Sequence, residues 1–203
     1  MKKTHLLFIV SILLANVVTT LTTWASTDTH GDDHCDYAAN LLANPDFTQD
    51  ERGRRYPWSS AQHAGERSFE LTVKDGVARI RKTGNQHWFT LNQRIPIETV
   101  RGHKLHYAAE LKLDLNNKGV RHAFGTGGGL TVFVRGAPGS GPDGNGILFN
   151  SRFEHEPHMG QHDWTAVAIE FTVPDEARSM RIGIAHYAGG ELSVRKPVLK
   201  ICD

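Results

Sequence analysis

Alternation of apolar and polar residues dominates the chain. Between residues 105 and 115 every second side chain is apolar, and His106, Glu110, Lys112 and Asp114 lie between them. A period of two indicates a strand with one buried face. The same pattern returns at 130–134 and 167–173, and shorter strands are predicted at 69–73, 77–82, 86–93, 180–187 and 192–201.

Turn signals separate these segments. Lys74-Asp75-Gly76 and Gly189-Gly190 each predict a tight hairpin. Residues 136–163, rich in Gly, Pro and His, are predicted to form the longest loop region. Because no segment longer than a turn or two has a helical period, the pattern indicates an all-β sandwich or barrel.

The first 25 residues predict a cleaved signal peptide. Lys2 and Lys3 precede an apolar run at 6–18, and small residues at Thr23 and Ala25 suit cleavage after Ala25. A retained anchor is the alternative, but the run is shorter than the roughly 20 residues of a spanning helix. We therefore expect residues 26–36 to form a polar tail, residues 37–203 to form the domain, and the protein to be secreted or periplasmic, with no membrane insertion after cleavage.

Charge and cysteine content fit that compartment. Without Lys2 and Lys3, 21 Lys+Arg would face 22 Asp+Glu, and no basic tail or stripe is present, which argues against a nucleic-acid partner. The two cysteines, Cys35 and Cys202, predict one disulfide between the ends of the domain.

Several motifs resemble the jelly-roll carbohydrate-binding modules of families four and nine and their galactose-binding-like relatives. They are an N-L-x-x-N-P-x-F opening at 40–47 followed by Trp58, then Trp164 with a strand-like run at 167–174, and the segments 181–184 and 190–194. The resemblance spans residues 40–199. It implies a jelly-roll β-sandwich of two antiparallel sheets that binds a polysaccharide or cell-surface glycan without altering it.

The same resemblance implies a structural calcium near the chain ends. The positions where the family places acidic ligands hold Thr48 and Arg195 in this chain. Since calcium takes six or more oxygen ligands and a guanidinium repels it, we expect no cofactor, and Arg195 could supply the positive charge itself.

Sugars bind to aromatic faces and planar polar side chains, so candidate ligand-binding residues are sought on the polar sides of strands. Gln86 and Trp88 form one such pair, although Trp88 could instead cover a second core layer. Phe133, Arg135 and Glu110 would form a mixed aromatic and charged face if their strands are neighbours, suited to a hydroxyl-rich or uronic ligand. His186 and Tyr187 could form a site at a loop end.

A histidine-rich segment at 154–163 offers His155, His158 and His162 as metal ligands, although the spacing matches no zinc motif and a solvated loop explains it equally well. Two other functions stay open. A jelly-roll glycan hydrolase or lyase would need paired carboxylates, for which Glu110, Glu154, Glu156 and Glu170 are available. A structural or adhesion protein of the cell envelope with a metal-binding loop is the third possibility.

Overall fold

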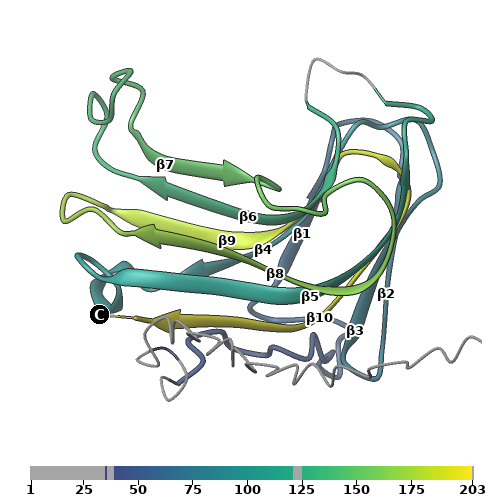
Figure 1. Cartoon of the computed structure of the whole chain (residues 1–203), viewed down its shortest axis with the longest axis horizontal. Helices are drawn as coiled ribbons and strands as arrows, with labels where there is room; N and C mark the ends of the chain where they lie inside the picture. Colours follow the sequence, from purple (N-terminus) through teal and green to yellow (C-terminus); the bar gives the residue numbers. More distant parts are fainter. Residues whose placement is uncertain (1–34, 36–38, 121–124, 203) are drawn as a thin grey trace, which may run out of the picture. The chain divides into compact units, whose positions relative to one another are not determined.

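The computed structural model describes residues 35, 39–120 and 125–202, and these form two antiparallel five-stranded sheets packed as a sandwich (Figure 1). Sheet A contains, in spatial order, β1 (Ser59–Gln62), β4 (Phe89–Ile95), β9 (Ser179–His186), β6 (Gly128–Arg135) and β7 (Ile147–Arg152). Sheet B contains β2 (Phe69–Lys74), β3 (Val77–Lys82), β10 (Gly189–Ile201), β5 (Lys104–Asn116) and β8 (Gly160–Thr172). The predicted jelly-roll β-sandwich is confirmed.

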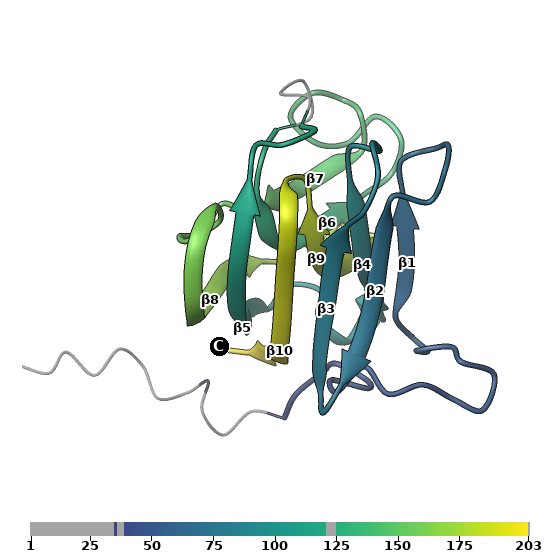
Figure 2. The ribbon, with the colours of Figure 1, turned by 90° about the vertical axis from the view of Figure 1, so that its right-hand side faces the viewer.

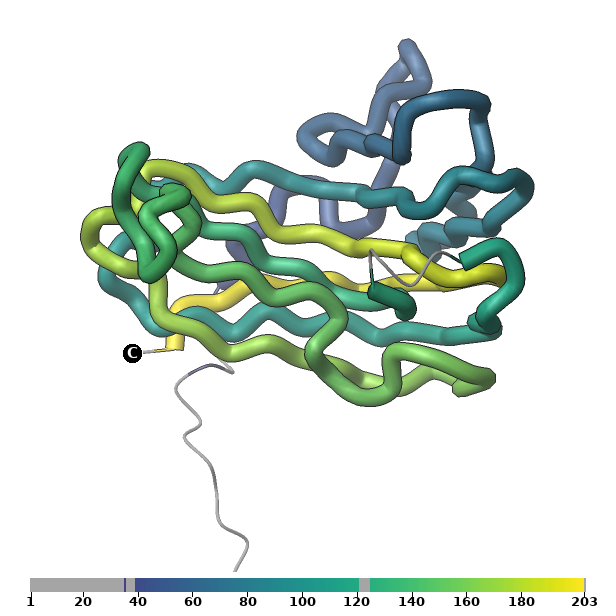
Figure 3. The backbone as a smooth tube through the Cα atoms, turned by 90° about the horizontal axis from the view of Figure 1, so that it is seen from above, coloured from purple at the N-terminus to yellow at the C-terminus, as the bar shows by residue number. Residues whose placement is uncertain are grey.

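Neighbours in each sheet come from distant parts of the chain. Sheet A joins β4 to β9 and β9 to β6, whereas sheet B joins β3 to β10 and β10 to β5. Figure 2 shows sheet B in front of sheet A, and Figure 3 shows the strands running back and forth between loops at the two ends. Residues that are close in sequence, such as those of β5 and β6, therefore lie in different layers.

Apolar side chains from both sheets fill the space between the layers. Leu91, Val132 and Ile182 enter from sheet A, and Ile80 and Leu111 from sheet B, each at most 1% exposed. The Tyr107 hydroxyl crosses the core from β5 and donates a hydrogen bond of 3.0 Å to the Gly183 carbonyl on β9. Burial raises the pKa of Tyr107 well above its usual range, so this hydroxyl stays a donor that ties the two sheets together.

Most of the predicted strands are present, and the Asp75-Gly76 hairpin between β2 and β3 is confirmed, with both residues at positive φ as a type I′ turn requires. Three predictions were wrong. Gln86 to Trp88 precede β4 instead of belonging to it. Gly189 and Gly190 begin β10, so the chain turns before them. The segment 136–163 contains β7 and the start of β8.

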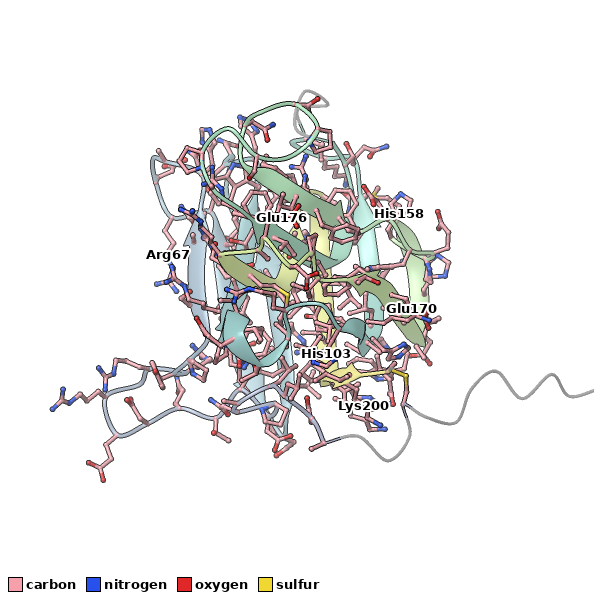
Figure 4. All side chains as sticks on the ribbon, turned by 90° about the vertical axis from the view of Figure 1, so that its left-hand side faces the viewer. Arg67, His103, His158, Glu170, Glu176 and Lys200 are labelled. Carbon is pink, nitrogen blue, oxygen red and sulfur yellow. A yellow bond between two sulfur atoms is a disulfide. The ribbon has the colours of Figure 1, made fainter. Side chains whose placement is uncertain are left out.

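The two ends of the domain are joined as predicted by a disulfide between Cys35 and Cys202, which lies near Lys200 (Figure 4). Next to it, the Leu41 amide donates to the Leu199 carbonyl at 2.8 Å, and the Leu199 amide donates to Asn40 Oδ1 at 3.0 Å. Residues 40 and 41 are thereby held beside the end of β10.

The predicted leader and most of the polar tail lie outside the described residues, so the domain boundaries stay predictions. Within residues 39–120 and 125–202 the helical content is a short 3₁₀ turn, η2 (Ile97–Thr99). No helix in the part of the chain that the structure describes is long and apolar enough to cross a membrane.

Candidate functional site: a groove on the outer face of sheet A

The outer face of sheet A carries a groove of about 420 Å³. It crosses the four neighbouring strands β4, β9, β6 and β7. Each strand contributes outward-pointing side chains, because alternate side chains of a strand point to opposite faces. Its lining residues come from β4, β9, β6, β7 and the residue that follows β9: Thr90, Asn92, Thr131, Val132, Phe133, Asn150, Arg152, Arg181, Ala185 and Tyr187.

Small side chains make the floor of the groove. Asn92 and Thr131 both pair with Gly183, one on each side of β9. A Cβ atom at Gly183 would lie 2.3 Å from the Leu91 carbonyl oxygen, so the backbones approach each other here as only glycine allows. Ala185, one step along β9, is also buried. The centre of the sheet is therefore low, and larger side chains surround it.

An aromatic cluster stands at one end of the groove. Tyr187 follows β9, and Trp88 stacks on it with ring centroids 6.4 Å apart and an interplanar angle of 21°. Phe153, directly after β7, contacts the same tyrosine at 5.6 Å. Arg152 places its guanidinium carbon 5.6 Å from the Tyr187 ring centroid. Tyr187 is only 8% exposed, so it forms the wall of the groove and its neighbours offer more open surface.

Phe133 lies on the strand β6, directly opposite Arg181 on β9 and Asn150 on β7. It is half-buried between Val132 and Val134, which are fully buried, as the alternation predicts. Arg135 stands beyond it, 5.8 Å from the Phe133 ring, and borders a second hollow formed with the β6–β7 connection. Of the predicted ligand-binding residues, Phe133 and Tyr187 thus line one groove, with Trp88 and Arg135 at its borders.

Glu110 does not join this face. Its strand, β5, belongs to sheet B, so the condition for grouping it with Phe133 and Arg135, that their strands are neighbours, is not met. On the outer side of sheet B, Glu110 accepts hydrogen bonds of 2.6 Å from Arg195 Nε and from Lys196 Nζ, and these contacts lower its pKa. Arg195 in turn lies 4.1 Å over the ring of Trp164. Both carboxylate oxygens of Glu110 therefore already accept hydrogen bonds from cationic side chains.

Gln86 and His186 also lie apart from the groove lining. Gln86 Oε1 contacts His63 Nδ1 at 2.7 Å, in the connection that follows β1. His186 points into the core, fully buried against Phe69 with ring centroids 5.4 Å apart. The alternation could have shown this, since His186 continues the inward series of Met180, Ile182 and Ile184.

The histidine-rich segment packs against the domain at the start of β6. A Cβ atom at Gly129 would lie 2.3 Å from His155 Nε2, so the missing side chain makes room for this ring. The Leu130 amide donates to His155 Nε2 at 2.8 Å, and burial lowers the pKa of His155 to about 4. In the folded protein, His155 Nε2 therefore carries no proton and accepts a hydrogen bond from the backbone.

The predicted metal ligands are not gathered into one site. His158 contacts Glu156 at 3.0 Å, and His162 lies exposed on β8. Among the described residues, no group of three or more His, Cys, Asp or Glu side chains is placed to hold a metal ion.

Of the ten residues that line the groove, the sequence prediction included two, Phe133 and Tyr187. Asn92 and Arg181 lie on predicted strands. Each points outward because its neighbour in the sequence, Leu91 or Ile182 respectively, is buried. Asn150 and Arg152 were missed because β7 was assigned to a loop. No local signal shows that these four residues share one face, since their strands are brought together only by the sheet order.

The comparisons with known proteins support the fold. No protein-family model matches the sequence, and no curated protein matches it. Among solved structures, the enzymatically active domain of bacteriophage CBA120 tailspike protein 4 has a TM-score of 0.51 at 13% identity, covering 80% of this chain and 21% of that one. The CBM22-1–CBM22-2 tandem domain of Paenibacillus barcinonensis Xyn10C has a TM-score of 0.51 at 11% identity, covering 82% of this chain and 46% of that one.

This chain spans about a fifth of the tailspike domain and just under half of the tandem. At these identities the likeness is one of fold. The chain has the jelly-roll β-sandwich fold found in carbohydrate-binding modules.

Proposed function

We propose that this protein is an exported, non-catalytic carbohydrate-binding protein that holds a polysaccharide in the groove of sheet A. The observation that carries the proposal is the composition of the groove. Phe133 and Trp88, the partly exposed member of the Trp88–Tyr187 stack, offer ring surface, while Asn92 and Asn150 offer planar amides. Sugar rings present C–H faces that pack on aromatic rings and hydroxyls that pair with amide donors and acceptors.

The length of the groove suits a chain and not a single sugar. Phe133 is level with Arg181 on β9, and Tyr187 comes six residues later, directly after the end of that strand. Six residues of extended strand cover about 20 Å. The two aromatic positions would therefore contact different sugar units of one polysaccharide.

The lining residues argue against a glycoside hydrolase. A glycosidase needs two carboxyl groups about 5 to 9 Å apart at the scissile bond. The ten described residues that line the groove include no carboxylate. Glu110 and Glu170, two of the candidates from the sequence, lie on sheet B and contact Arg195 and Lys104 respectively.

Affinity gel electrophoresis against a panel of neutral and acidic polysaccharides tests the proposal. The full chain should be retarded by at least one polysaccharide, with no shortened or unsaturated product. Phe133→Ala should weaken binding by about tenfold or more, the effect of losing a central aromatic contact. Its melting temperature should change little, because Phe133 is only half-buried.

Trp164→Ala is the matched control, since it removes an aromatic side chain from the outer face of sheet B. If Trp164→Ala abolished retardation and Phe133→Ala did not, the binding site would lie on sheet B, and the proposed groove on sheet A would be ruled out. Retardation by no polysaccharide would overturn the function itself, and release of product would replace it with an enzyme. Trp88→Ala should also weaken binding, because it removes the support of Tyr187.

Export belongs to the same proposal. The disulfide between Cys35 and Cys202 is typical of proteins in oxidising compartments. Expression of the full chain in a bacterial host, followed by fractionation and N-terminal sequencing, should give a mature chain in the periplasm or medium that begins near Ser26. An uncleaved cytoplasmic chain would contradict this part.

A further inference from the structure

The charges of the two sheets are sorted in opposite ways. The five strands of sheet A contain four arginines and no Asp, Glu or Lys. These arginines are all exposed and all on the outer face: Arg94, Arg135, Arg152 and Arg181. The five strands of sheet B carry both signs, with acidic residues at Glu70, Glu110, Asp114, Asp163, Glu170 and Glu191.

Ion pairs repeat the contrast. On sheet B, Arg79 contacts Glu191 at 3.0 Å, and Lys112 contacts Asp163 at 3.0 Å. Arg81, Lys104, Arg195 and Lys196 have carboxylate partners as well. Within residues 39–120 and 125–202, the four arginines of sheet A make no ion pair. The cationic groups at the groove are therefore uncompensated by the fold.

Arg94 and Arg181 face each other directly on the neighbouring strands β4 and β9. Like charges in opposed cross-strand positions destabilise a sheet. The Arg94–Arg181 pair therefore lowers the stability of the free protein. A bound ligand with an anionic group between or beside the two guanidinium groups would remove this repulsion.

Two of the arginines lie next to the aromatic rings that would hold sugars. Arg152 lies 5.6 Å from the Tyr187 ring, and Arg135 lies 5.8 Å from the Phe133 ring. Each pair therefore combines an aromatic ring with a guanidinium group that can donate two parallel hydrogen bonds. A uronate unit has the matching pair of features, because its ring offers C–H groups and its carboxylate accepts two parallel hydrogen bonds from arginine.

We propose, on the basis of the proposed function, that the groove is selective for a polyuronate, a polysaccharide with a carboxylate on successive sugar units. The polymer would lie across sheet A with its rings against Phe133 and the Tyr187 cluster. Its carboxylates would be bound by Arg152 and Arg181, the two arginines that line the groove.

Carboxyl reduction gives the sharpest test, because it converts a polyuronate into a neutral polymer with the same backbone. Binding of the full chain is measured by affinity electrophoresis and calorimetry on polygalacturonate, alginate, their carboxyl-reduced forms, a neutral xylan and a sulfated glycan. At least one polyuronate should bind about tenfold or more tightly than its reduced form, as expected when charge-assisted hydrogen bonds are removed. Added salt should weaken that binding.

Arg181→Gln and Arg152→Gln should each lower polyuronate affinity by about tenfold. Arg79→Gln, which removes the same charge from the outer face of sheet B, should leave it unchanged. Equal binding of native and reduced polymers, or equal loss in Arg79→Gln, would overturn the inference. So would binding of the sulfated glycan without any polyuronate, which would assign the arginines to sulfate.

The two proposals fail separately. Binding of neutral polymers that is lost in Phe133→Ala and unaffected by Arg181→Gln would leave the carbohydrate-binding function in place and remove the polyuronate selectivity. Binding of no polymer of any charge would remove both.

Discussion

Two buried histidines should make the protein sensitive to mild acid. Burial lowers the pKa of His155 and of His186 to about 4, from 6.5 in an unfolded chain. Between these values the unfolded chain holds a proton at each histidine that the folded chain lacks, so acid favours unfolding. For His155 the structure adds a second reason, since protonation of Nε2 would break its hydrogen bond from the Leu130 amide.

The size of the effect follows from the two pKa values. The stabilisation is complete above about pH 6.5 and is lost progressively as pH falls toward 4. A fall from 6.5 to about 4 is worth about 3 kcal/mol per histidine when complete, and about 2 kcal/mol of that should be lost by about pH 5. Carboxylates such as Glu110, whose pKa is lowered by hydrogen bonds from Lys196 and Arg195, add their losses mainly below this range.

Urea unfolding followed by tryptophan fluorescence at pH 7, 6 and 5 measures the free energy of unfolding directly. The His186→Leu variant keeps an apolar side chain in the core and cannot bind a proton, so its stability should fall by about 2 kcal/mol less than that of the parent between pH 7 and 5. Identical pH slopes for the parent and His186→Leu would show that His186 is not held neutral by burial.

Three further changes test the fold. Replacing Cys35 and Cys202 by Ser should lower the free energy of unfolding by about 5 kcal/mol, measured in urea, because the disulfide closes a loop of 167 residues; an unchanged midpoint would contradict this. Gly129→Ala should cost about 1 to 3 kcal/mol and shift the ring signals of His155 in NMR, since the new Cβ overlaps that ring. Tyr107→Phe should cost about 1 to 3 kcal/mol by calorimetry, because the Gly183 carbonyl loses its donor, and a neutral result would mean that water replaces the hydroxyl.

The local rules of the sequence determined most of the secondary structure. Alternation placed Val132, Val134, Leu111 and Leu113 in the core, because the side chains of a strand point to opposite faces in turn. The Asp75-Gly76 turn was readable because its two residues tolerate positive φ. The disulfide was readable because the chain has two cysteines.

Other elements lacked a local signal. The strand β7 was missed because Ile147, Leu148 and Phe149 form an apolar run without alternation inside a segment rich in Gly and Pro. Gln86 and Trp88 were placed on a strand because positions 86 and 88 continue the outward series of Thr90. Pairing with β9, however, begins only at Phe89. Periodicity describes side-chain direction and does not mark where hydrogen bonding to a neighbour starts.

The groove itself was decided by the tertiary structure. Alternation shows that Phe133 and Glu110 both point away from the core, but not which sheet each strand joins. The jelly-roll order places β6 between β9 and β7 and sends β5 to the opposite sheet, so Phe133 meets Arg181 and Asn150 while Glu110 meets Arg195. Strand pairing between distant segments depends on hydrogen bonds and packing across the whole domain, and those contacts leave no trace in the spacing of nearby residues.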